Sequence, residues 1–115
     1  MPCIQLSTNQ ILSSDKQTIL KKNFGKAIEI IPGKSEKWLM CKFQSACDMW
    51  FQGEQKYVVF LEVSLYGEPE GKDIDQLTKQ LTQIVSQELD IELENIYVKY
   101  SMTPYWGWNG KNLGR

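Results

Sequence analysis

The sequence follows the order strand, helix, strand, and then repeats that order once. Its strand candidates are rich in β-branched and aromatic residues, and its helix candidates repeat apolar residues every three or four positions. The strand candidates are 2–8, 37–46, 57–66 and 95–101, and the helix candidates are 14–31 and 74–89. Each half is about as long as one βαβ unit, roughly 30 residues or more. We therefore expect an α/β fold in which two βαβ units form a four-stranded mixed sheet with two helices on one face.

Local signals set the ends of these elements. Ser13, Ser14 and Asp15 are N-cap candidates for the first helix, and Ser14, followed by Gln17 three positions later, has the form of a capping box. Pro32 and Gly33 predict its end. The aromatic and glycine-rich segment 104–110 is typical of a short edge hairpin.

The chain has the size of one domain. Its 115 residues are 42% hydrophobic and 23% charged, which predicts one globular domain spanning 1–115. A net charge of -1 provides no field for nucleic acid or an anionic membrane, so neither partner is expected. No apolar run approaches the roughly 18 residues of a membrane span. No signal peptide is visible, which predicts a cytoplasmic protein and leaves secretion without a signal peptide open.

The residue types that are rare narrow the chemistry. There is no histidine, the commonest general base and zinc ligand, and the single arginine is Arg115. An anion site must therefore use lysine, backbone amides or an amine, and we expect no cofactor or metal. Cys3, Cys41 and Cys47 are odd in number and widely spaced, which predicts small core residues in a reducing compartment.

Two helices on one face leave the other face of the sheet uncovered. We expect Val, Leu and Phe side chains on that face, and an apolar face of this size does not stay hydrated. The sequence therefore predicts oligomerisation through the sheets.

The N-terminus is unusual because Pro2 opens an apolar strand. Initiator methionine is usually removed before proline, and removal would expose a secondary amine. A terminus is normally frayed and solvated, but one that is embedded in a sheet is held in place. An amine held in this way can act as a base.

A set of short stretches is similar to those of the macrophage migration inhibitory factor and D-dopachrome tautomerase family. The stretches are Met1-Pro2-Cys3, Gly33-Lys34, Met49-Trp50-Phe51, Ser64-Leu65, Ile96-Tyr97-Val98 and Gly107-Trp108-Asn109-Gly110. They occur in the family's order, at nearly its spacing, over almost the full length. The resemblance implies the family's tautomerase fold and a homotrimer with a barrel-like centre and active sites at subunit boundaries. It also implies keto–enol tautomerase activity on aromatic 2-oxo acids such as phenylpyruvate.

The resemblance assigns roles to individual positions. Pro2 matches the catalytic base, Lys34 the lysine beside it, and Tyr97 the tyrosine that the adjacent subunit supplies. The substrate-binding candidates are Lys34, Trp38, Ser64, Leu65, Tyr97, Lys99, Trp108 and Leu113. Among them, Leu65 matches an aliphatic wall with a backbone amide near the proline, and the tryptophans and Leu113 match the mouth of the pocket. Without the resemblance, Lys34 is typical of a solvated loop and Tyr97 of a core or an interface.

These residues suit proton transfer between carbon and oxygen. The reaction needs a base that is neutral near pH 7 and a donor for the enol oxygen. An α-amino group has a pKa of about 7.7 to 8 and a prolyl amine is more basic, but burial and a neighbouring lysine both lower the pKa. Tyr97 can donate a hydrogen bond where negative charge develops. Trp38 and Trp108 suit a flat apolar substrate.

The sequence departs from the family pattern at three places. Lys99 replaces the asparagine usual in mammalian members two residues after the tyrosine, and is either a pocket cation or an exposed strand residue. Tyr57-Val58-Val59-Phe60 replaces the Cys-x-x-Cys of some members, so thiol oxidoreductase activity is not implied. The loop Tyr66-Gly67-Glu68-Pro69-Glu70 is more acidic than usual.

Two alternative functions remain at this stage. One is a trimeric cytokine-like signalling protein with a protein receptor and a vestigial tautomerase site. The other is a dehalogenase or decarboxylase of the wider superfamily. This second alternative is disfavoured because such relatives bind carboxylates with arginines, and Arg115 is the only arginine.

Overall fold

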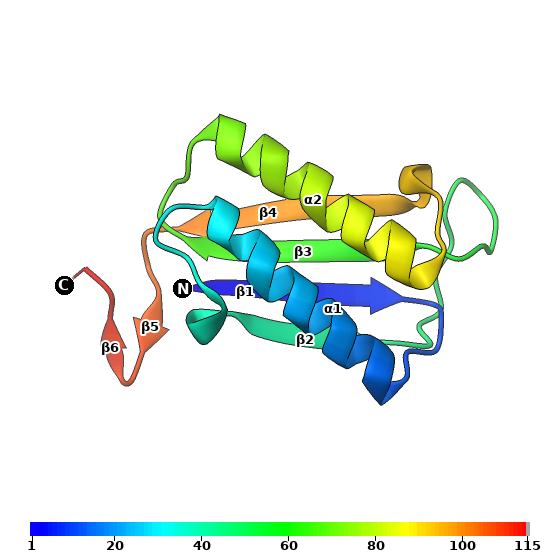
Figure 1. Ribbon diagram of the computed structural model, residues 1–115, viewed down its shortest axis with the longest axis horizontal. Coiled ribbons are helices and arrows are strands. Elements are labelled where there is room, and N and C mark those ends of the chain that lie inside the picture. Colours follow the sequence, from blue (N-terminus) through cyan, green and yellow to red (C-terminus); the bar gives the residue numbers. More distant parts are fainter. Residues whose placement is uncertain (115) are drawn as a thin grey trace.

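The computed structural model describes residues 1–114 and contains a four-stranded sheet with two helices on one face (Figure 1). The strands are β1 (Pro2–Thr8), β2 (Met40–Gln44), β3 (Val59–Tyr66) and β4 (Ile96–Thr103). Their order in the sheet is β2-β1-β3-β4. β1 pairs with β2 in parallel and with β3 in antiparallel fashion, and β3 and β4 are parallel. The predicted mixed sheet of two βαβ units is confirmed.

The helices are α1 (Ser14–Ala27) and α2 (Gly71–Leu89). Of the three N-cap candidates the structure uses Ser13 and not the capping-box residue Ser14, because the side-chain oxygen of Ser13 accepts a hydrogen bond from the backbone N–H of Lys16 at 3.1 Å. Ser13 has the extended backbone of a cap, which leaves Ser14 as the first helical residue. A 3₁₀ turn, η1 (Ile28–Ile30), continues α1 to two residues before Pro32.

The apolar core lies between the helices and the sheet. It is formed by alternate residues of the strands and by one stripe of each helix. Its fully buried members include Ile4, Leu6, Leu61, Val63, Leu65, Leu20, Phe24, Leu77, Leu81 and Val85. In the part of the chain that the structure describes, no helix is both long and apolar enough to cross a membrane.

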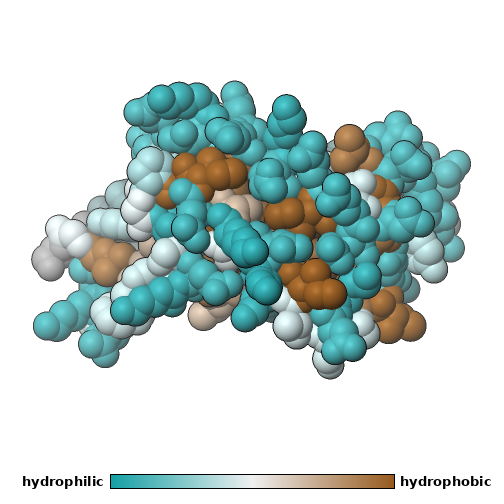
Figure 2. Space-filling view, in the orientation of Figure 1, coloured by the Kyte–Doolittle hydropathy of each residue, from teal (hydrophilic) through white to brown (hydrophobic). Residues whose placement is uncertain are grey.

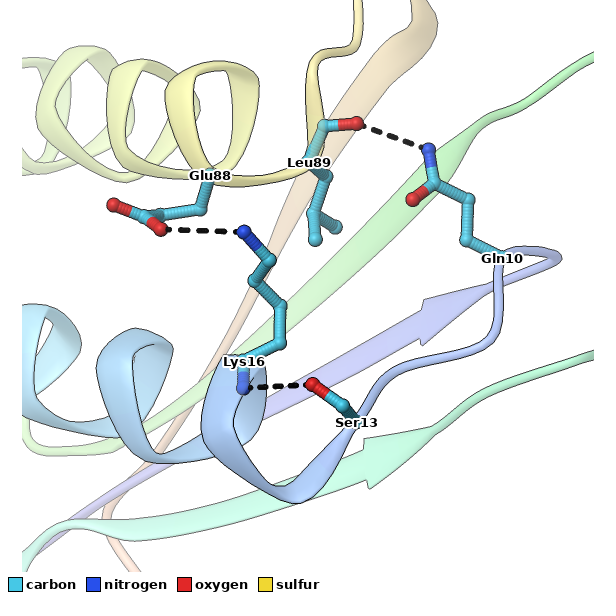
Figure 3. A network of polar contacts seen from close by, with 5 residues as sticks. All are labelled: Gln10, Ser13, Lys16, Glu88 and Leu89. Carbon is cyan, nitrogen blue, oxygen red and sulfur yellow. Dashed lines mark hydrogen bonds and ion pairs between the residues drawn. The ribbon is translucent and has the colours of Figure 1, made fainter.

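Polar contacts connect the start of α1 to the end of α2 (Figure 3). Lys16 Nζ lies 3.8 Å from Glu88 Oε2, and Gln10 Nε2 donates a hydrogen bond to the backbone carbonyl of Leu89 at 3.1 Å. The ion pair is partly exposed, and such pairs contribute only about 0–1 kcal/mol. The two helices are therefore held to the sheet mainly by their buried apolar stripes.

The uncovered face of the sheet is polar, so the predicted apolar face is wrong. Strand alternation points the Val and Leu side chains of β3 toward the helices and leaves Phe60, Glu62, Ser64 and Tyr66 on the other side. One row across this face consists of Lys42, Gln5, Glu62 and Lys99, which are neighbours in register. On the helix side, hydrophilic residues dominate the surface, and smaller apolar patches lie between the helices and at both ends of the molecule (Figure 2).

Short elements lie at the ends of the sheet. The expected strand 37–46 is shorter than predicted, because its first residues form a 3₁₀ turn, η2 (Glu36–Trp38), that includes Trp38. A second turn, η3 (Leu93–Asn95), precedes β4. A C-terminal hairpin is present, with β5 (Gly107–Trp108) paired with β6 (Lys111–Asn112), but it begins later than the expected segment 104–110 and forms a two-stranded sheet of its own. Asn109 and Gly110 form its two-residue turn, both with positive φ, as this turn type requires.

The cysteines are free thiols, but the prediction that they are small core residues is only partly right. Cys41 packs against the core, and burial raises the pKa of its thiol to about 11. Cys3 and Cys47 are half-buried and outside the core cluster. Cys3 lies on the polar face of the sheet because its strand neighbours Pro2 and Ile4 point toward the helices.

Candidate active site

The N-terminal amine lies at the head of an interior strand of the sheet. β1 has a neighbour on each side, and Pro2, its first residue, is buried opposite Leu65 of β3. Proline is tolerated at the first position of a strand because its missing N–H removes no ladder hydrogen bond there. The backbone N–H of Tyr66 donates to the carbonyl of Met1 at 3.1 Å. The terminus is therefore held in place by the sheet.

Lys34 is brought to this terminus by the turn that follows the first helix. Ile31 is buried in the core, Pro32 and Gly33 end the helical segment, and the backbone N–H of Lys34 donates to the carbonyl of Ile31 at 3.1 Å. The half-buried Lys34 side chain then extends to the end of β3, where Nζ donates to the backbone carbonyl of Tyr66 at 2.8 Å. This carbonyl belongs to the residue whose N–H binds Met1.

The environment of the terminus favours a neutral amine. Burial, followed by the charge of Lys34 and its hydrogen bond, lowers the pKa of the Met1 amine from 8.0 to about 6. At pH 7, an amine with a pKa of about 6 is about nine-tenths neutral, whereas one with a pKa of 8.0 is only about one-tenth neutral. An amine at this place is therefore available as a base near neutral pH.

A cleft of about 290 Å³ opens beside Lys34. Its wall includes Ile31, Pro32, Lys34, Tyr66, Glu68, Pro69, Glu70 and Asp73. The acidic loop that distinguishes this sequence is thus part of the same cleft as the lysine. A second cleft, of about 340 Å³, lies at the opposite end of β1 around Asn9 and Tyr57, away from the amine.

Two tryptophans meet at the amine's end of the molecule. Trp38, in η2, and Trp108, in β5, contact each other edge to face, with ring centroids 4.9 Å apart and planes at 81°. Leu113 is half-buried behind the hairpin, where its backbone N–H donates to the carbonyl of Trp106 at 2.9 Å. Figure 1 shows η2, β5 and β6 beside the N-terminus. These residues form an aromatic wall at this edge of the sheet.

Tyr97 is not brought to this site within one chain. It pairs with Phe60, five residues along β3 from the partner of Pro2, which at about 3.3 Å per residue separates the two positions by about 17 Å. Figure 1 shows that β4 begins at the end of the sheet opposite the N-terminus. The Tyr97 ring packs edge to face against Phe51, with ring centroids 5.0 Å apart.

The other strand candidates lie at intermediate distances. Lys99 pairs with Glu62, three residues from Leu65, and shares the polar face with Tyr97. Ser64 lies on that same face opposite Cys3, while the Leu65 side chain is fully buried on the helix side. Any contact of Leu65 with a substrate at the polar face would therefore use its backbone.

The structure thus brings together some of the predicted residues and separates others. Pro2, Lys34 and the backbone of Leu65 gather at the N-terminus, whereas Tyr97 and Lys99 lie along the sheet. Sequence reasoning gave Tyr66 no role, although it contacts both Met1 and Lys34. The bond to Met1 and the hydrogen bond from Lys34 use the backbone of Tyr66, and no pattern of side chains could have revealed these two contacts. Arg115 lies outside the described residues.

Comparison with known structures places this fold in one class. The chain superposes on Leishmania major MIF2 with a TM-score of 0.92 and 28% identity, covering 98% of this chain and 97% of that one. A macrophage migration inhibitory factor homologue from Prochlorococcus marinus gives a TM-score of 0.87 at 26% identity, with 97% and 99% covered. An asymmetric trimer of a fused 4-OT protein gives 0.88 at 16% identity, with 98% and 99% covered. The chain thus shares its fold with macrophage migration inhibitory factor homologues and with the 4-OT protein.

The family follows from a match to a family model. The model of the macrophage migration inhibitory factor (MIF) family matches residues 1–114, and the chain belongs to this family. No protein with a curated description matches the chain significantly.

Proposed function

We propose that this protein is a keto–enol tautomerase of aromatic 2-oxo acids of the phenylpyruvate type. The proposal rests on one observation above all. An amine at the head of an interior strand is partly buried beside Lys34, and its pKa is lowered to about 6. Removal of Met1 would transfer the free amine to Pro2, which is buried at the same place.

The amine of Pro2 is the base in this proposal. It takes a proton from the carbon next to the carbonyl of the 2-oxo acid, the carbonyl oxygen gains a proton, and an enol results. The reverse reaction returns the proton from the prolyl ammonium to carbon. Lys34 attracts the substrate carboxylate and keeps the free amine neutral. Trp38 and Trp108 supply a flat apolar wall for the aromatic ring.

The donor to the substrate oxygen is Tyr97 of a neighbouring copy in a homotrimer. The separation of about 17 Å along the sheet leaves the site of a single chain without this tyrosine. The 4-OT protein with this fold that is described as an asymmetric trimer supports three-fold assembly. A polar sheet face is compatible with assembly, because Lys42, Glu62 and Lys99 provide both signs of charge for pairing between copies.

The test compares two forms of the protein that differ only at the N-terminus. The first begins at Pro2, as verified by intact mass, and the second retains Met1. Ketonisation of enol-phenylpyruvate is followed by ultraviolet absorbance. We expect turnover in the first form and its near loss in the second, because a peptide bond removes the basic lone pair of the proline nitrogen and the free amine of Met1 lies one residue away from that position. Equal turnover of the two forms would overturn the proposed mechanism, and its absence from both would overturn the proposed function.

A further inference from the structure

Tyr66 contacts Lys34 in two ways. Its backbone carbonyl accepts a hydrogen bond from Lys34 Nζ at 2.8 Å, and its ring centroid lies 5.8 Å from the same atom. The second distance is within the range of about 6 Å for a cation–π interaction. One residue therefore fixes the ammonium group from two directions.

The backbone around Tyr66 is itself firmly held. Its N–H donates to the carbonyl of Met1 at 3.1 Å, and the N–H of Gly67 donates to the carbonyl of Thr103 at 2.9 Å. These bonds connect the end of β3 to the N-terminus on one side and to β4 on the other. Removal of Met1 would eliminate the first of these bonds, but the pairing of Pro2 with Leu65 and the bond from Gly67 to Thr103 would remain. A cation bound to the Tyr66 carbonyl consequently has a fixed position relative to the Pro2 amine.

The ring of Tyr66 is bounded by the C-terminal segment. A methyl group built on Gly114 would lie 2.6 Å from Tyr66 Oη and 3.9 Å from Cζ, which is too close for the hydroxyl. Gly114 also has φ +76°, a conformation that side-chain-bearing residues rarely adopt. The absence of a side chain at Gly114 thus lets the backbone pass close to the Tyr66 hydroxyl. The backbone at this place then limits the movement of the Tyr66 ring.

We propose that Tyr66 is a positioning residue that holds the Lys34 ammonium beside the N-terminal amine, and that the passage of Gly114 keeps the Tyr66 ring in place. The inference rests on the proposed function in taking that amine as the base. Tyr66 touches neither substrate nor reacting atoms in this role and acts through Lys34.

The need for such a residue follows from the charges in the cleft. Glu68, Glu70 and Asp73 line the cleft together with Lys34. Lysine carries a compact charge on a flexible four-carbon stem, so these carboxylates can attract the Lys34 ammonium group away from the N-terminal amine. Glu70 already pairs with Lys72 at 3.5 Å, on the exposed side. The Tyr66 ring and carbonyl oppose the displacement of Lys34 toward this acidic rim.

The first experiment separates the ring from the hydroxyl. Tyr66→Leu removes the ring, Tyr66→Phe keeps it, and Tyr57→Leu makes the same change at an exposed tyrosine near the opposite end of β1. All are prepared with a free Pro2 amine and checked for folding and assembly by circular dichroism and light scattering. The amine is titrated by NMR of ¹³C-labelled proline, and kcat and KM are measured against pH with phenylpyruvate.

We expect Tyr66→Leu to raise the pKa of the proline amine and to move the acid limb of kcat/KM with it. KM for phenylpyruvate should rise about three- to tenfold, while kcat at high pH changes less than about twofold, because the base itself is retained. Tyr66→Phe and Tyr57→Leu should keep the wild-type pKa. An unchanged amine pKa in a folded Tyr66→Leu protein would overturn the inference. The NMR titration requires no turnover, so the pKa comparison remains decisive even if the protein does not turn over phenylpyruvate.

The second experiment tests the passage of Gly114 and does not depend on how Tyr66→Leu folds. Gly114→Ala should raise the amine pKa and KM in the same direction, because its methyl group displaces the tyrosine ring. In the Tyr66→Phe background the hydroxyl is gone and the next ring atom lies 3.9 Å away, so the same substitution should have a smaller effect. Backbone strain at 114 is common to both backgrounds and cancels in the comparison. Equal effects in the two backgrounds would refute the contact as the cause.

Discussion

The distance between Pro2 and Tyr97 leads to a sharp prediction about mixed assemblies. Within one chain the two positions are about 17 Å apart along the sheet, too far for both to contact one small substrate. In the proposed trimer, each site takes its amine from one subunit and its tyrosine from the next. Pro2→Gly impairs the first residue and Tyr97→Phe the second, so each variant alone should have little activity.

The two variants should restore each other's activity when they share a trimer. If they are unfolded together in equal amounts and refolded, each subunit next to a given amine is of either kind with equal chance. About one site in four then combines an intact proline with an intact tyrosine, which predicts about one quarter of wild-type kcat at saturating phenylpyruvate. A site completed within a single chain predicts no recovery.

The assay needs three controls. Wild-type protein taken through the same unfolding and refolding defines full activity, and each variant refolded alone defines the background. Light scattering must show the same assembly size in every sample. Activity of the mixture no greater than the mean of the two variants would refute the assignment of Tyr97 to a neighbouring subunit.

Four further substitutions test other parts of the structure. Lys34→Met removes the charge and the hydrogen bond that lower the pKa of the terminal amine but leaves burial, so the acid limb of kcat/KM should move upward; an unmoved limb would exclude the lysine's effect. Lys99→Asn should raise kcat/KM for 4-hydroxyphenylpyruvate relative to phenylpyruvate and move the acid limb upward, and an unchanged ratio and pH profile would place Lys99 outside the site. Trp108→Ala should raise KM without moving the limb, since the contact with Trp38 is apolar; a shifted limb would contradict this. Leu81→Ala, in the core, should lower the free energy of unfolding by about 2–5 kcal/mol in urea titrations, whereas a change below about 1 kcal/mol would show that the core around Leu81 is not close-packed.

The fold was predictable because local pattern and tertiary burial agree. In β3, residues 59, 61, 63 and 65 are apolar and all are buried, as period-two alternation requires. The same alternation explains the wrong prediction of an apolar outer face. The Val and Leu residues of β3 all fall on the face that the helices cover, so they are not available to make the outer face apolar.

The candidate site was predictable only where side chains identify themselves. Pro2, Lys34 and Tyr97 are recognisable by residue type and order in the chain. The distance between Pro2 and Tyr97, however, is set by the register of the strands. Register follows from pairing between segments that are distant in sequence, which no local pattern shows. The role of Tyr66 could not be predicted for a related reason, because its carbonyl and its ring meet Lys34 only once the turn after α1 is placed against the end of β3.

The polar outer face of the sheet affects how subunits behave when they separate. The row of Lys42, Gln5, Glu62 and Lys99 is already well hydrated in a lone subunit, so dissociation exposes little apolar surface along this row. Such subunits resist precipitation, and their association then depends on concentration and ionic strength. Dilution into high salt followed by dialysis should therefore exchange subunits between the proposed trimers without denaturant.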